Sequence, residues 1–179
     1  MGIIRFIATN DPPNRTSQKI CCFHLLASVT KSAGVTASVE EITNTFNTEF
    51  IFYAGALSLC DGEIADEELK ALSEIFGYKF DHLTVMNAAQ GFANNVEEIP
   101  ACVKIAVDID NAVADNKDID VLLSIGVASM FANIAQAIVA ADEQLTENEA
   151  KLAIGYVNYL SEYVGKNLSE AAKAKLPKE

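Results

Sequence analysis

Two segments of this chain carry nearly the same pattern, 81 residues apart. The first reads LSLCDGEIADEELKAL from Leu57 to Leu72, and the second reads IVAADEQLTENEAKLA from Ile138 to Ala153. In each segment an apolar helix end is followed by a short acidic turn and then by the start of another helix. We therefore expect one tandem duplication of a helical unit, with any functional site at or near the two turns.

Apolar residues follow a helical period through most of the chain, and no convincing strand-like alternation occurs beyond the first eight residues. These patterns predict an all-α protein. A capping-box pattern from Ser38 to Glu41, and Pro100 in a first helical turn, mark two of the helix starts. The expected helices span residues 19–31, 38–60, 65–76, 82–92, 100–114, 121–141, 146–164 and 167–177.

The domain organisation follows from the length and from the repeat. A chain of 179 residues suits one domain, so we predict a single compact helical bundle of two pseudo-repeated helical units around a central buried helix. Residues 1–37 would form an N-terminal arm with the first helix, and residues 166–179 a C-terminal tail helix. Between them, residues 38–165 would form the helical domain, with repeat units at about 38–97 and 98–165.

The central helix is predicted from the 21 uncharged residues between Val121 and Ala141. This run is long enough to span a bilayer. It contains several polar residues, however, and it is flanked by Asp120 and Asp142 without a Lys or Arg anchor. A helix buried on most sides is therefore the favoured interpretation, and a membrane span is the alternative.

Composition limits the possible functions. The formal net charge of −12 repels phosphate backbones, so nucleic-acid binding is not expected, whereas cations or basic protein partners would be attracted. None of the four cysteines belongs to a CxxC pair, which suits reduced thiols in the cytoplasm. There is no nucleophile elbow, P-loop or dinucleotide-binding motif, so we predict that the protein is not an enzyme.

The acidic turns resemble half of a calcium loop but are not EF-hands, because Leu57 and Leu59 stand where two oxygen ligands are needed. A glutamate at the third position of each second helix should still point back toward the preceding aspartate. Two carboxylates are too few for a hard cation, but the two turns together would offer enough. The candidate ligands of a divalent metal ion, with Ca²⁺, Mg²⁺ and Zn²⁺ not distinguished, are Asp61, Glu63, Glu68, Asp142 and Glu149.

The same residues also have a purely structural interpretation. The segment from Thr146 to Glu149 is a capping-box pattern, and Asp61-Gly62 is a common turn dipeptide. Acidic residues in a first helical turn also complement the helix dipole. Capping does not explain why an aspartate precedes the glutamate by seven residues in both copies, so both interpretations stay open.

A further acidic run lies between Asp108 and Asp120. Asp108 and Asp110 are two positions apart and therefore lie on different faces of a helix. Asp118 and Asp120 suit the N-terminus of the helix that follows. We expect this run to be solvated surface.

The duplicated pattern resembles the TerB-like family of tellurite-resistance proteins over about residues 38–165. The residues that carry the resemblance are Asp61, Gly62, Ile64, Glu68, Asp142, Leu145 and Glu149. The second copy departs from the family pattern in having Glu143 where glycine is usual.

The resemblance implies an all-helical domain whose acidic residues hold a metal ion. It also implies a place in bacterial stress-response complexes, often at the cytoplasmic side of a membrane that the protein reaches through its partners. The expected function is thus a non-enzymatic cytoplasmic metal-binding module with protein partners. The alternative is a metal-independent protein-interaction module that uses an acidic or an apolar face.

Overall fold

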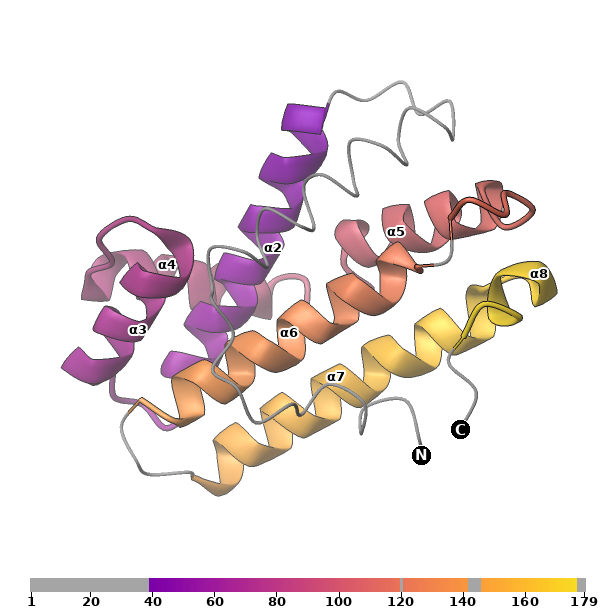
Figure 1. The fold of residues 1–179 in the computed structure, drawn as a ribbon. Coiled ribbons are helices and arrows are strands. Elements are labelled where there is room, and N and C mark those ends of the chain that lie inside the picture. Colours follow the sequence, from indigo (N-terminus) through magenta and orange to yellow (C-terminus); the bar gives the residue numbers. More distant parts are fainter. Residues whose placement is uncertain (1–38, 120, 142–145, 177–179) are drawn as a thin grey trace.

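A computed structural model describes residues 39–119, 121–141 and 146–176, which form helices and no strand (Figure 1). This confirms the all-α class. The predicted arm and first helix, residues 1–37, lie outside the described residues. The described helices are α2 (Val39–Ser58), α3 (Asp66–Phe76), α4 (His82–Ala93), α5 (Ala101–Ala112), α6 (Leu123–Val139), α7 (Glu147–Asn167) and α8 (Glu170–Lys173).

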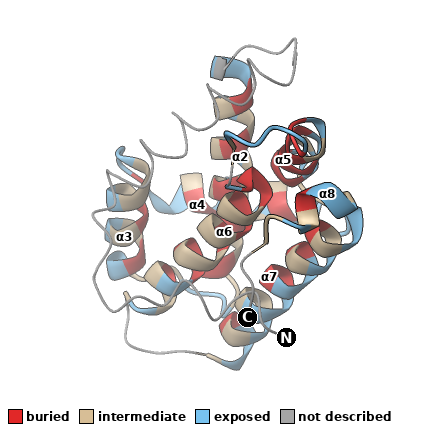
Figure 2. Cartoon of the chain, turned by 45° about the vertical axis from the view of Figure 1, so that its right-hand side comes forward, coloured by how far each residue is buried: buried red, intermediate tan, exposed pale blue. Residues whose placement is uncertain are grey.

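Helix α6 is the central helix, as predicted. It packs against α2, α5 and α7, and of its residues only Gln136 is exposed (Figures 1 and 2). Its apolar residues therefore contact other helices of the same chain. Across the described ranges, no helix has the length and apolar character that crossing a bilayer requires.

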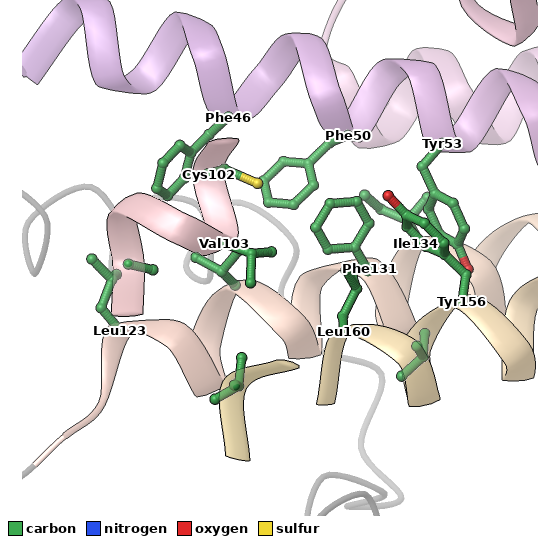
Figure 3. Close-up of a cluster of buried hydrophobic side chains, with 14 of the residues drawn as sticks. Phe46, Phe50, Tyr53, Cys102, Val103, Leu123, Phe131, Ile134, Tyr156 and Leu160 are labelled. Carbon is green, nitrogen blue, oxygen red and sulfur yellow. The ribbon is translucent and has the colours of Figure 1, made fainter. Parts of the chain in front are cut away.

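An aromatic cluster fills the space between α2, α6 and α7 (Figure 3). The ring of Phe131 on α6 contacts Phe50 edge-on, with 4.8 Å between centroids, and lies 5.3 Å from Tyr53. Tyr156 from α7 stacks on Tyr53 at 4.9 Å. Phe50 and Phe131 are 81 residues apart, so equivalent positions of α2 and α6, the helices that lead into the two repeated segments, meet in the core.

Helix α4 packs closely against α2 because α2 has a glycine where the two helices meet. A Cβ atom at Gly55 would lie 2.6 Å from the Cβ atom of Ala88 and 2.9 Å from the carbonyl oxygen of Val85. Real Cβ atoms do not approach so closely, so any larger residue would push the helices apart.

The two halves differ after their matching junctions. Helix α3 ends at Phe76, and the capping residue Gly77 that follows has a left-handed φ of 80°, which glycine adopts easily. The equivalent position in the second half is Asn158, and α7 continues through it to Asn167. The predicted repeat of whole units therefore stays a prediction, and the predicted tail helix is shorter than expected.

Candidate functional site

The two acidic junctions have the same boundaries at the 81-residue offset. Helix α2 ends at Ser58 and α3 begins at Asp66, whereas α6 ends at Val139 and α7 begins at Glu147. The N-cap residues also match in backbone conformation. Ala65 has φ −73° and ψ 148°, and Thr146 has φ −76° and ψ 159°.

Glu68 and Glu149 occupy the third position of their helices, and both side chains turn back as predicted. The backbone N–H of Ala65 donates to Oε2 of Glu68 at 2.9 Å, and that of Thr146 donates to Oε2 of Glu149 at 2.7 Å. Both glutamates are buried, with exposed fractions of 3% and 2%. Buried carboxylates are costly unless they are hydrogen-bonded, so these bonds help to hold them there.

The remaining predicted ligands are placed differently. Asp61 and Glu63 are exposed, and Oδ1 of Asp61 accepts a hydrogen bond from the backbone N–H of Glu63 at 3.1 Å. Gly62 lies between them with a φ of 95°. Asp61 thus closes a tight turn. Asp142 lies outside the described residues, as does Glu143.

Cys60 precedes Asp61 in the first junction and is half-buried. The pKa of its thiol is raised from its ordinary value to about 11 by burial, and then by the negative charges of Glu149, Asp61 and Glu68. Glu149 belongs to the second junction, and Asp61 and Glu68 belong to the first. Carboxylates from both junctions therefore act on one thiol, which means that the junctions lie close together.

Sequence reasoning missed Cys60, because a cysteine in an apolar helical context is usually a small core residue. The available signal was its position immediately before Asp61. As for a metal centre, the described ranges contain no group of three or more His, Cys, Asp or Glu side chains that could hold an ion. The loop with Asp142 is not part of those ranges.

The expectation that Asp110 belongs to a solvated surface is wrong. Asp108 is exposed, but Asp110 is only 2% exposed. Its two carboxylate oxygens accept hydrogen bonds from the backbone N–H groups of Leu123 and Ser124, each at 2.8 Å. Asp110 therefore caps α6 from the preceding helix. Burial raises its pKa, although the hydrogen bonds from α6 oppose that shift.

Glu49 of α2 caps α5 in the same way. Its carboxylate oxygens accept from the N–H groups of Ala101 at 2.6 Å and Cys102 at 2.7 Å. The residues at the two N-cap positions, Pro100 and Leu122, have no side-chain oxygen. Both helix starts therefore depend on a carboxylate from a distant part of the sequence.

Replacing Ala65 with serine is expected to stabilise the protein by about 0.5–1 kcal/mol. At the equivalent position of α7, Oγ1 of Thr146 accepts a hydrogen bond from the backbone N–H of Glu149 at 3.2 Å. Ala65 has the same extended backbone, so a serine hydroxyl there should accept the corresponding hydrogen bond from Glu68. Removing that oxygen with Thr146→Ala should cost about 1 kcal/mol. Urea unfolding followed by circular dichroism measures both. If Ala65→Ser destabilises the protein, the two caps are not equivalent.

Comparisons of the chain with known protein families, with curated proteins and with solved structures find no match.

Proposed function

We propose that this protein is a non-enzymatic, cytoplasmic module that binds a divalent metal ion between its two acidic junctions and acts in complexes with protein partners. The observation that supports this proposal is the pair of buried glutamates, Glu68 and Glu149, held at matching positions of the two junctions by backbone N–H groups. The pKa of the Cys60 thiol agrees with it, because it is raised first by burial and then by the charges of carboxylates from both junctions. Negative charges from two distant parts of the sequence therefore act on the same thiol. The TerB-like pattern of the same residues favours the same proposal.

The physical reason is electrostatic. Carboxylates that share a partly desolvated site repel each other, and a divalent cation relieves that repulsion. Oε2 of each glutamate accepts a backbone N–H, which fixes the orientation of both carboxylates at the junctions. Asp61, Glu63 and Asp142 complete the proposed set. Such oxygen ligands suit Ca²⁺ or Mg²⁺, and Zn²⁺ is a third ion to test.

The test is a titration with each ion after treatment with a chelator, followed by calorimetry and thermal unfolding. An ion at a hundred times its dissociation constant should stabilise the wild type by about 3 kcal/mol. The double variant Asp61→Asn with Asp142→Asn should fold but lose this response.

A matched control removes two other acidic charges from the same junctions. Asp66 and Glu147 are exposed in the first turns of α3 and α7. The variant Asp66→Asn with Glu147→Gln should therefore keep the metal response. No response in the wild type, or an equal loss in both double variants, would contradict the proposed site.

A metal-independent interaction module is the second candidate, and exposed apolar side chains near α4 favour it. Leu83 and Met86 are 66% and 53% exposed one helical turn apart, and Tyr78 is 47% exposed nearby in the sequence. This candidate predicts that none of the three ions changes the unfolding temperature. It also predicts that replacing Leu83 with glutamate weakens partner binding without changing stability.

A further inference from the structure

A pocket of about 470 Å³ opens between α2, the end of α4, the start of α5 and α7. Its volume is in the range of small-molecule sites. Its lining comes from residues 44–52, 92–104 and Tyr156, and does not include the acidic junctions. The pocket is therefore a separate feature of the fold.

Aromatic rings line the inner part of the pocket. Phe92 and Tyr156 are buried and meet edge to face, with 5.0 Å between ring centroids. Phe52 also lines the pocket, and its ring lies against α4 at Gly91, where a Cβ atom would come within 2.7 Å of the ring. Aromatic faces bind apolar groups and attract cations.

Three side-chain donors of the pocket are used in hydrogen bonds inside the protein. The hydroxyl of Thr48 donates to the carbonyl oxygen of Asn44 at 2.9 Å, and that of Thr45 donates to the carbonyl of Glu41 at 3.0 Å. The amide of Asn95 donates to the carbonyl of Gly91 at 2.8 Å. The hydroxyl and amide oxygens keep accepting capacity.

The charges lead to the same conclusion. The N-terminus of α5 borders the pocket, but its N–H groups at Ala101 and Cys102 donate to Glu49 and do not attract an outside anion. Glu49 and the exposed Glu98 bring two carboxylates to the lining, against the single cation of Lys104. A ligand that donates hydrogen bonds and carries positive charge is favoured over an anion.

We propose that this pocket binds a small organic ammonium compound, with its apolar or aromatic part against Phe52 and Tyr156 and its ammonium group among the oxygens of Thr48 and Glu98. The ammonium donates hydrogen bonds to these oxygens, and its charge complements the excess of carboxylates in the lining. The proposal does not depend on the metal site.

The test uses phenethylammonium and, as a probe of similar shape and opposite charge, 3-phenylpropanoate. Saturation-transfer NMR and calorimetry are carried out in the presence of a chelator, which separates the result from metal binding. We expect the ammonium to bind at least tenfold more tightly than the carboxylate. No saturation transfer to the ammonium, or equal affinity for both probes, would overturn the proposal.

Two tryptophan variants, one inside the pocket and one outside it, test whether phenethylammonium binds in this pocket. Thr48 is exposed at the pocket, whereas Asn87 is exposed on α4 outside its lining. Thr48→Trp should fill the pocket and weaken phenethylammonium binding at least tenfold, and Asn87→Trp should leave it unchanged. Glu98→Gln should reduce the preference for the ammonium over the carboxylate. Unchanged binding in Thr48→Trp, with a folded circular dichroism spectrum, would place the ligand elsewhere.

Discussion

Replacing Asp110 with alanine is expected to lower the free energy of unfolding by about 2–5 kcal/mol. The side chain is buried, and its two oxygens are the acceptors for the N–H groups of Leu123 and Ser124. Alanine leaves both groups buried without that acceptor, and it weakens the start of the central helix. Urea unfolding followed by circular dichroism gives the change directly.

Two further variants show whether the loss of stability comes from the lost hydrogen bonds to α6 or from the lost negative charge. Asp108→Ala removes the same charge from an exposed position of the same helix and should change stability by at most about 0.5 kcal/mol. Asp110→Asn keeps one acceptor oxygen and should cost roughly half as much as alanine. Equal losses for Asp108→Ala and Asp110→Ala would mean that the two N–H groups do not depend on Asp110.

Replacing Phe131 with alanine is expected to destabilise the protein by about 3–5 kcal/mol. The ring is fully buried and contacts rings from both neighbouring helices, Phe50 on α2 and Tyr156 on α7. Its removal leaves a cavity that rigid helices fill only in part. The free energy of unfolding from urea or thermal denaturation measures the loss.

The controls for Phe131 vary size and burial. Phe131→Leu keeps most of the apolar volume and should cost clearly less than alanine. Leu83→Ala removes an apolar side chain that is 66% exposed and should change stability by about 0.5 kcal/mol or less. A loss below about 1 kcal/mol for Phe131→Ala would contradict the aromatic cluster as the centre of the core.

The sequence was sufficient for the features that depend on neighbouring residues. Helix starts and ends follow from apolar periodicity and from capping residues, so α3 and α7 begin within one residue of their predicted positions. The backward turn of Glu68 and Glu149 is also local, because the third position of a helix lies over the N-cap N–H group.

Long-range contacts could not be predicted in the same way. Asp110 caps a helix 13 residues away, and Glu49 caps one 52 residues away, so no local pattern marks either residue as buried. The only local hint was the lack of a side-chain oxygen at Pro100 and Leu122. The role of Cys60 likewise depends on Glu149, which approaches it only in the folded chain.

The most direct test of the facing junctions is the pH dependence of Cys60 alkylation, followed peptide by peptide with mass spectrometry. We predict an apparent pKa of about 11, which should fall in Glu149→Gln because one negative charge near the thiol is removed while the cap acceptor is kept. It should stay unchanged in Glu147→Gln, which alters an exposed residue of the same helix that is paired with Lys151. A thiol that titrates near its ordinary value of about 8.5 and does not respond to Glu149→Gln would contradict the account.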